Sequence, residues 1–164
     1  MDATPSLAGD PSERVARAYL RALGGDDVEA IVGLVAPDFR NEHLSALGEG
    51  STGRAAYRAR LPGFLTAFPE RAYRVVDLVA APRGDTAQVV VRYELHAVHH
   101  DVSRDDGARS DEGARRDDGG PPASRAVVVP GMMWLAVSGG LVTSRVDCWD
   151  SLTFLRQTDQ VPPR

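Results

Sequence analysis

The sequence has a single cysteine, no lysine and no long apolar run, and two of these scarcities exclude classes of protein. Cys148 alone cannot form an internal disulfide framework or a zinc site built from several cysteines. No apolar run approaches the about 18 residues that a membrane-spanning helix needs. The first residues lack the basic start and apolar stretch of a signal peptide. All 19 basic residues are arginine, which reflects codon usage rather than chemistry.

Charge and length narrow the class further. The 23 acidic residues outnumber the 19 basic ones, and the net charge of −4 argues against a general nucleic-acid binder. We therefore expect a cytoplasmic protein with no nucleic acid and no membrane among its partners. A chain of 164 residues is one domain's worth, and it can bury roughly 70% of its unfolded surface without a disulfide or metal.

The domain boundaries follow from composition. We expect a disordered N-terminus over 1–10, one domain over 11–160 and a tail over 161–164. Residues 101–124 consist mainly of Asp, Arg, Gly and Ser, which offer almost nothing to bury. This segment is predicted to be a disordered insertion without chemistry, and a mobile lid or a partner-binding arm is the alternative.

The first part of the chain has a helical period. Asp10 and Pro11 are typical of a helix start, and Gly24-Gly25 predicts its end. A second short helix is predicted to begin at Asp26 or Asp27 and to end at 36–38.

A loop and a third helix follow. Residues 39–50 are predicted to form the loop, and Ser51-Thr52 are predicted to cap a helix that extends to Phe68. Pro62 lies inside this pattern and predicts a kink or a break.

After Pro69 the period changes to two, which predicts strands. They are expected at 73–80, 86–99, 126–137 and 141–149, with a glycine hairpin turn at 138–140 and a last helix capped by Asp150. In the second strand, one face carries Val89, Val91, Tyr93 and Leu95, and the other carries Gln88, Arg92, Glu94 and His96.

Four sequence words carry a resemblance to a known family. They are ARAYLRALGGDDVEAIVGLVAPDF, GRAAYRARLPGFLTAFPE, VVVRYELHAVH and GLVTSRVDCWDSLTFLRQ. In this order they resemble the nuclear transport factor 2-like superfamily, and specifically its SnoaL-like polyketide cyclase branch, over residues 12–158 without the insertion. The resemblance implies an α+β fold, a cone-shaped barrel of a strongly curved antiparallel sheet packed on three helices, with a C-terminal helix. It also implies a homodimer, because related chains pair through the outer face of the sheet. This fold carries several unrelated reactions, so it does not fix the chemistry.

Asp147 is the first candidate for catalysis. It shares a strand face with Arg145 and Trp149, and a desolvated carboxylate beside tryptophan suits acid/base work near neutral pH. In SnoaL-like cyclases and limonene epoxide hydrolases, an aspartate at this place transfers protons, so the resemblance implies that role for Asp147. The alternative is an ion pair with Arg145 or a solvated strand end.

Arg92 and Glu94 are the next candidates. They lie two apart and project from one strand face, so with Asp147 they could form a carboxylate–guanidinium–carboxylate row. Such a row resembles the Asp/Arg/Asp set of limonene epoxide hydrolases, with a longer acid at Glu94. A polar outer face or a dimer contact is the alternative.

Asn41 and His43 follow Phe39 in the predicted loop. The motif Phe39-Arg40-Asn41 is similar to an aromatic-x-Asn motif of epoxide hydrolases, but it lacks the aromatic hydroxyl. SnoaL-like chains often carry a histidine near the position of His43. An exposed loop is the alternative.

No metal site is expected, because His96 and His99 point to opposite faces of a strand. Cys148 is predicted to be a core residue.

Bulky apolar residues are expected to wall a pocket for a hydrophobic small molecule such as a polyketide, terpene or steroid. They are Tyr19, Phe39, Leu61, Phe64, Met133, Trp134 and Trp149.

The preferred hypothesis for the function is a cofactor-independent tailoring enzyme of natural-product biosynthesis, a cyclase or isomerase that uses acid/base catalysis. An epoxide hydrolase or epoxide-opening cyclase based on Asp147, Arg92 and Glu94 is an alternative. A cyclase that acts by shape alone, or a non-catalytic binding protein, is another.

Overall fold

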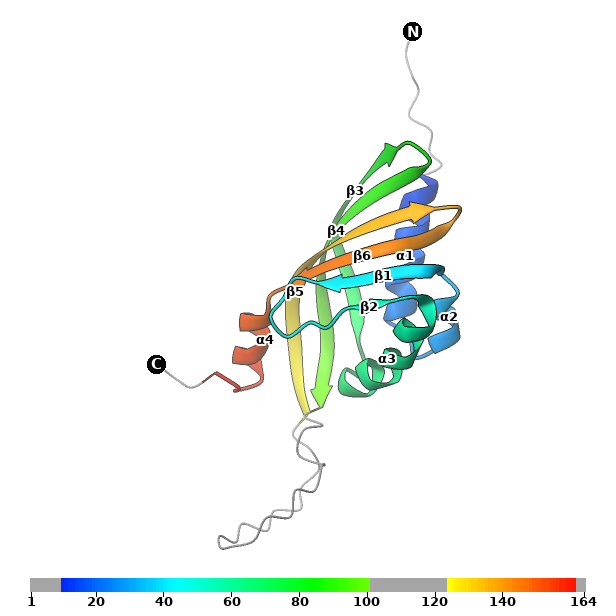
Figure 1. Cartoon of the computed structure of the whole chain (residues 1–164). Coiled ribbons are helices and arrows are strands. Elements are labelled where there is room, and N and C mark those ends of the chain that lie inside the picture. The colour runs from blue at the N-terminus through cyan, green and yellow to red at the C-terminus, as the bar shows by residue number, and fades with distance from the viewer. Residues whose placement is uncertain (1–9, 101–123, 162–164) are drawn as a thin grey trace, which may run out of the picture.

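The computed structural model describes residues 10–100 and 124–161 and shows four helices and six strands in these ranges (Figure 1). Their order is α1 (Pro11–Leu23), α2 (Val28–Val32), β1 (Val35–His43), β2 (Ser51–Thr52), α3 (Arg54–Ala67), β3 (Ala72–Arg83), β4 (Thr86–His100), β5 (Ser124–Ser138), β6 (Leu141–Trp149) and α4 (Ser151–Gln157). The predicted N-terminal disorder, insertion and tail fall wholly or largely outside the described residues. No helix in the described ranges is long and apolar enough to cross a membrane.

Three of the helices have an aspartate at the N-cap position, as the sequence predicts. Asp10 accepts a hydrogen bond from the backbone N–H of Ser12 at 2.7 Å, ahead of Pro11 at the first position of α1. Asp27 caps α2 and Asp150 caps α4 in the same way. Each cap satisfies backbone donors that a helix start otherwise leaves without a partner.

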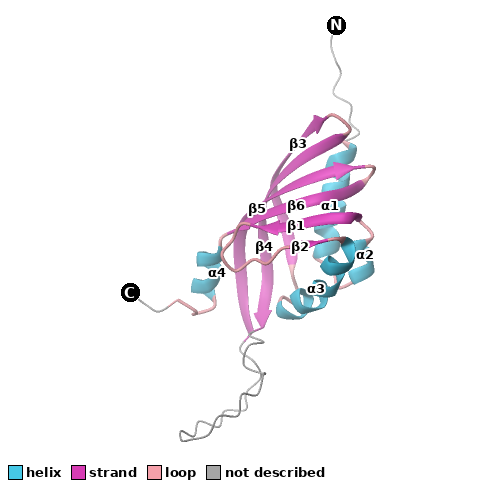
Figure 2. Cartoon of the chain, in the orientation of Figure 1, coloured by secondary structure: helices cyan, strands magenta, loops and turns pink. Residues whose placement is uncertain are grey.

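The six strands form one open, strongly twisted sheet in the order β2-β1-β6-β5-β4-β3 (Figure 2). Antiparallel pairing joins β3 to β4, β4 to β5 and β5 to β6. Glycines with positive φ make two tight turns, Gly84 at 62° between β3 and β4, and Gly139 and Gly140 at 57° and 78° between β5 and β6. The fold is therefore the expected α+β arrangement of a curved sheet around helices.

Two strands, β1 and the short β2, are missing from the prediction. Residues 35–43 form β1, where the sequence indicates the end of a helix and a loop, and β1 pairs parallel to β6. The sheet is consequently mixed rather than wholly antiparallel. Buried residues such as Val35 and Phe39 explain the strand, because they pack into the core with the backbone held by β6.

The third helix also differs from the prediction at its start. Ser51 and Thr52 pair with β1 as the short strand β2, and Gly53, with φ of 87°, occupies the N-cap position instead. Helix α3 then continues from Arg54 to Ala67 without the break expected at Pro62. A proline in a helix removes one backbone hydrogen bond, and the remaining bonds hold this helix together.

The sheet has a covered face and an open face. Helices α1 to α3 gather on one side of the sheet, whereas α4 stands at the opposite end beside β5 (Figure 1). Val89, Val91 and Tyr93 of β4 are buried toward the helices. Cys148, predicted to be core, is exposed on β6, so that prediction is wrong.

Candidate active site

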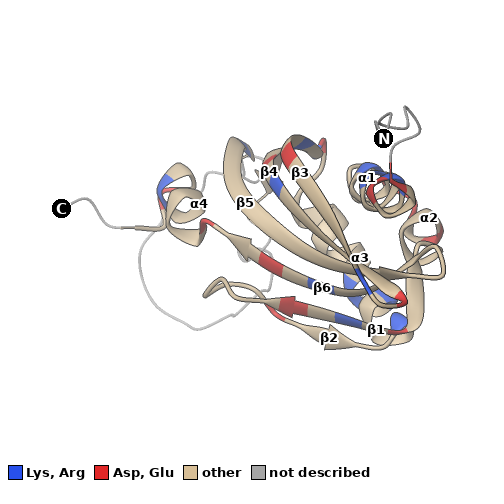
Figure 3. Ribbon diagram, turned by 90° about the horizontal axis from the view of Figure 1, so that it is seen from above, with Lys and Arg blue, Asp and Glu red and all other residues tan. Residues whose placement is uncertain are grey.

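The parallel pairing of β1 with β6 builds the centre of the site. In this register Asn41 lies opposite Arg145, and His43 lies opposite Asp147. The backbone N–H of Leu44 donates to the carbonyl of Asp147 at 2.8 Å, which extends the pairing by one residue. Seen from above, β1 and β6 run side by side and both carry charged bands (Figure 3). Two polar pairs from segments 104 residues apart in the chain thus meet at one place.

Asp147 is the buried acid of this site, with 2% of its surface exposed. The hydroxyl of Tyr93 donates to its Oδ1 at 2.7 Å, and the guanidinium of Arg145 donates to its Oδ2. The Nδ1 of His43 lies 3.9 Å from Oδ2, close enough for electrostatic interaction but too far for a hydrogen bond. The ion pair with Arg145 is therefore present, and it is buried rather than solvated.

The neighbours of Asp147 keep well-defined protonation states. Burial, reinforced by the charge of Asp147, raises the pKa of Tyr93 far above its usual range, so this hydroxyl remains a donor. Burial acts to lower the pKa of Arg145, but Asp147 and nearby tyrosine hydroxyls together raise it well above the ordinary value. A protonated phenol and a cation therefore both face the carboxylate.

His43 is a neutral base beside this pair. Burial, with a further contribution from the cation of Arg145, lowers its pKa from 6.5 to about 4, although Asp147 opposes the shift. Its Nε2 lies 3.2 Å from the side-chain amide nitrogen of Asn41. Among the described residues, three buried atoms of the site lack a hydrogen-bond partner: Nδ1 of His43, Oδ1 of Asn41 and Nε of Arg145. Buried polar groups rarely remain unpaired, so these atoms are available to a bound molecule.

Two tyrosines extend the polar network away from Asp147. Arg145 donates through Nη1 to the hydroxyl of Tyr19 at 3.4 Å, and this hydroxyl lies 2.7 Å from that of Tyr57. Tyr19, which belongs to α1, is fully buried, whereas Tyr57 lines the cavity from α3. A hydrogen-bonded chain therefore runs from Tyr93 through Asp147, Arg145 and Tyr19 to Tyr57.

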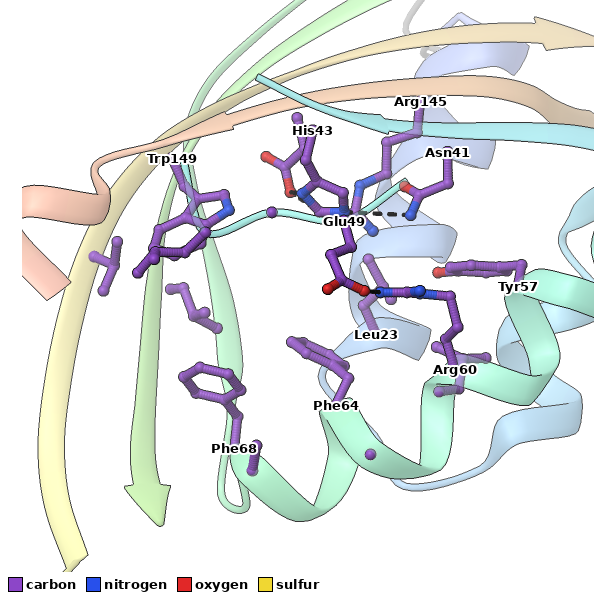
Figure 4. A pocket seen from close by; sticks show the side chains of 18 of the residues that line it. Leu23, Asn41, His43, Glu49, Tyr57, Arg60, Phe64, Phe68, Arg145 and Trp149 are labelled. Atoms are coloured by element: carbon purple, nitrogen blue, oxygen red, sulfur yellow. Dashed lines mark hydrogen bonds and ion pairs between the residues drawn. The ribbon is translucent and has the colours of Figure 1, made fainter. Parts of the chain in front are cut away.

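The site opens into a cavity of about 560 Å³. Asn41, His43 and Arg145 lie together at its polar end, and aromatic side chains lie farther along it (Figure 4). Asp147, which contacts His43 and Arg145, belongs to the same end. The apolar part includes Leu61, Phe64, Phe68, Leu95, Trp149 and Phe154. This volume and polarity suit a multi-ring organic molecule with a few oxygen atoms at one end.

A short loop forms one wall of the cavity. Leu47, Gly48 and Glu49 come from the segment between β1 and β2, and Glu49 pairs with Arg60 of α3 at 2.6 Å (Figure 4). Ser45 fastens the same loop to β6, since its hydroxyl accepts from the backbone N–H of Trp149 at 2.7 Å. The loop is thus tied to both sides of the cavity.

The structure brings several predicted residues together. Asp147, Asn41 and His43 meet at the polar end, and Leu61, Phe64 and Trp149 line the cavity as expected. Other residues expected at the wall are not among those that line it. Tyr19, Phe39 and Met133 are fully buried in the core, where Phe39 packs its ring against both Tyr19 and Tyr57.

Trp134 lies on the wrong side of the sheet for its predicted role. Its side chain is 50% exposed on the open face of β5, and its indole N–H donates to Gln88. The neighbouring residue Met133 points inward instead, because successive side chains of a strand alternate between faces.

Arg92 and Glu94, which were also predicted to be site residues, likewise lie on the open face of the sheet. Arg92 is exposed, and Glu94 pairs with Arg74 at 2.8 Å and with His96 at 3.1 Å on the open face. These contacts lower the pKa of Glu94, the largest contributions being hydrogen bonds from His96 and Arg74. The expected row with Asp147 does not form, because the inward face of β4 belongs to the apolar set that includes Tyr93.

Tyr93 and Tyr57 are the site residues that the sequence analysis misses. The alternation of β4 already places Tyr93 on the face of Val89 and Val91, and a pocket on the helix-covered face must draw on that face. No sequence pattern marks Tyr57 as a site residue, because its contact with Tyr19 forms only when α1 and α3 pack together. No group of three metal-ligating side chains gathers within residues 10–100 and 124–161.

The fold and this buried acid define the class: a nuclear transport factor 2-like α+β protein with a pocket between sheet and helices. The family model described as "SnoaL-like domain" matches residues 16–145, and the chain belongs to this family. A comparison with curated proteins finds no match.

Solved structures agree on the fold. A candidate SnoaL-like polyketide cyclase from Shewanella putrefaciens has 18% identity and a TM-score of 0.70, covering 93% of this chain and 98% of its own. IdmH of Streptomyces antibioticus, a candidate polyketide cyclase, has 20% identity and a TM-score of 0.65, with 92% and 99% covered. TerC, co-crystallised with polyporic acid, has 15% identity and a TM-score of 0.64, with 92% and 99% covered. At these identities the likeness concerns the fold.

Proposed function

We propose that this protein is a cyclase or isomerase of polyketide-like natural products that uses Asp147 as its acid/base group without a cofactor. One observation carries the proposal: a carboxylate with 2% exposure sits at the polar end of a mostly apolar cavity. Water excluded from such a place cannot compete for the proton that the carboxylate takes. The family membership supports a cyclase or isomerase role of this kind.

The proposed reaction begins with proton removal. Asp147 takes a proton from a carbon next to a carbonyl group of the substrate, and the electron pair moves onto the carbonyl oxygen as an enolate. Both carboxylate oxygens already accept one hydrogen bond, from Tyr93 and Arg145, and each retains a second lone pair for this proton. The two donors hold the carboxylate in one orientation during the transfer.

The second step distinguishes the two reaction types. In a cyclisation, the enolate carbon bonds to a second carbonyl carbon of the same molecule, and the new alkoxide takes the proton back from Asp147. In an isomerisation, the proton returns to a different carbon. Atoms balance in both cases because the product is an isomer of the substrate. The neutral His43, whose Nδ1 has no partner among the described residues, is placed to carry a proton between positions.

The cavity supports an aromatic or multi-ring substrate. Phe64, Phe68 and Trp149 present flat apolar faces, and flat rings stack favourably on such faces. IdmH is a candidate polyketide cyclase, and TerC was crystallised with polyporic acid. We therefore propose fused-ring polyketides with adjacent carbonyl groups as the substrate class.

The test is turnover of such compounds by the wild type and by Asp147→Asn. Loss of a positioned acid/base group typically lowers the rate by about 10²–10⁴-fold. The panel comprises anthraquinones and naphthoquinones with a β-ketoester side chain, and the products are separated by chromatography and analysed for ring closure by NMR spectroscopy. Asp77→Asn is the matched control, because Asp77 is exposed on β3 and should leave turnover unchanged.

Full turnover by a folded Asp147→Asn variant would contradict the acid/base proposal. The cavity would then act by shape alone. Binding of the panel without turnover by the wild type would instead indicate a binding protein.

A further inference from the structure

A second catalytic group emerges from the direction of the hydrogen bonds that link Arg145, Tyr19 and Tyr57. A guanidinium only donates hydrogen bonds, so the oxygen of Tyr19 must accept from Arg145. The hydroxyls of Tyr19 and Tyr57 lie 2.7 Å apart, and one of them donates to the other. The direction of that bond decides which hydroxyl keeps a free proton.

The surroundings of the two tyrosines decide the direction. If Tyr57 donated to Tyr19, the proton of Tyr19 would need another acceptor in a place with no exposed surface. Among the described residues the hydroxyl of Tyr19 has hydrogen-bond partners only in Arg145 and Tyr57, and a buried donor left without an acceptor is costly. If Tyr19 donates to Tyr57, both tyrosine oxygens and the proton of Tyr19 have partners, and of the two hydroxyls only the proton of Tyr57 is left without one.

The proton of Tyr57 then points to the one side that holds room for an acceptor. Tyr57 lines the cavity from α3, and its hydroxyl end is directed toward the interior of the pocket (Figure 4). Burial raises the pKa of Tyr57 well above its ordinary value, so the hydroxyl keeps its proton at neutral pH. A donor of this kind, backed by the positive charge of Arg145 through Tyr19, is stronger than an isolated phenol.

We infer that Tyr57 is a catalytic hydrogen-bond donor that binds the carbonyl oxygen of the substrate and stabilises it as it becomes an enolate. The inference deepens the proposed function, since it rests on proton removal by Asp147. Asp147 and Tyr57 are linked through Arg145 and Tyr19, so the base and the donor share a single cation. Donors aimed at a developing oxyanion are among the largest contributions to catalysis, about 10²–10³-fold each.

The experiment uses an anion that resembles the enolate and needs no turnover. The probe is 2-hydroxyanthraquinone, a flat three-ring phenol whose phenolate has its own visible absorption band. Its pKa is measured when bound to the wild type and to Tyr57→Phe. A hydrogen bond to a charged acceptor is worth about 1.5–3 kcal/mol, so Tyr57→Phe should raise the pKa of the bound dye by about one to two units.

Two further variants make the result specific. Tyr73→Phe removes another hydroxyl from the cavity wall and should raise the pKa of the dye less than Tyr57→Phe does, since no hydrogen bond joins Tyr73 to Arg145, Tyr19 or Tyr57. Tyr19→Phe should give a smaller rise than Tyr57→Phe, because the donor remains and only its polarisation is lost. Circular dichroism confirms that each variant is folded.

The inference is overturned if Tyr57→Phe leaves the pKa of the dye unchanged, or if the wild type does not bind the dye. It is also overturned if Tyr73→Phe or Tyr19→Phe raises the pKa of the dye as much as Tyr57→Phe does. Failure of the proposed function is separate. It is seen as retained turnover in Asp147→Asn, whatever the dye shows.

Discussion

At the scale of single residues, the site holds two opposite charges and keeps the polar groups around them neutral. Arg145 and Asp147 are buried and bonded to each other, and burial raises the pKa values of Tyr57 and Tyr93 and lowers that of His43. A buried pair tolerates loss of one partner poorly, because the other charge is then left without compensation. This balance gives His43 a measurable signature in the pH dependence of stability.

The first prediction concerns His43→Gln. The histidine has a pKa of about 4 in the folded protein against 6.5 ordinarily, so the unfolded chain binds its proton more readily. The stabilisation is therefore complete above pH 6.5 and is lost as the pH falls toward 4. Over this range the wild type should lose roughly 1–3 kcal/mol more unfolding free energy than His43→Gln, which does not titrate.

Urea unfolding at several pH values measures this difference. His96→Gln provides the control, because His96 is partly exposed on the open face and far from Asp147 in the sheet. Parallel stability curves for the wild type and His43→Gln would show that the folded protein does not hold His43 neutral.

At the scale of elements, β5 contains a glycine that the site depends on. Gly131 lies opposite Tyr93 in the pairing of β4 with β5. A Cβ at this position would come within 2.4 Å of the Tyr93 hydroxyl and ring, which no real structure accommodates. The absence of a side chain at Gly131 therefore gives Tyr93 the space from which it reaches Asp147.

The second prediction is that Gly131→Ala displaces Tyr93. Forcing an extra methyl group into packed surroundings costs typically about 1–3 kcal/mol, and turnover should fall with the loss of the Tyr93–Asp147 hydrogen bond. The matched control for stability is Gly63→Ala in α3, where a Cβ meets nothing within 4 Å. Turnover is not compared with this variant, because Gly63 lines the cavity. Alanine is the better helix former there, so this control should gain about 0.5–1 kcal/mol in thermal unfolding. A Gly131→Ala variant as stable and active as the wild type would refute the argument.

At the scale of the whole molecule, the open face of the sheet carries an apolar row. Val79, Val90, Trp134 and Val146 lie in register across β3, β4, β5 and β6. Trp134 and Val79 are 50% and 62% exposed, and Met132 beside them is also 50% exposed. We propose that a second copy of the chain covers this row, because a twofold contact brings the same residues of both copies together.

The third prediction is a homodimer that charge on this face disrupts. A stable dimer typically buries about 800 Å² on each partner, and a glutamate at its centre would have to be buried without a counter-ion. Sedimentation at tens of micromolar should show a dimer for the wild type and a monomer for Trp134→Glu. Leu152→Glu is the control, since Leu152 is similarly exposed but lies on α4. A monomeric wild type, or dimers of both variants, would contradict the proposal.

The fold was largely predictable from local signals. The caps at Asp10, Asp27 and Asp150 and the change of period after Pro69 depend on neighbouring residues, and the structure confirms them. Strand β1 was not predictable in this way. Its pattern resembles a loop, and it becomes a strand because β6, more than 100 residues later in the chain, supplies its hydrogen bonds.

Part of the candidate site was likewise predictable from local signals, and part of it was not. The order of residues in the last strand was enough to place Asp147 on one strand face with Arg145 and Trp149, because alternation is a local property of an extended chain. Alternation alone could not decide which face of β4 turns inward, and the polar face with Arg92 was the wrong choice. The packing of helices on the apolar face is what lets Tyr93 reach Asp147 and Tyr57 meet Tyr19. Burial is a property of packed elements: the face with more apolar area turns to the core, and the polar atoms on it become the site.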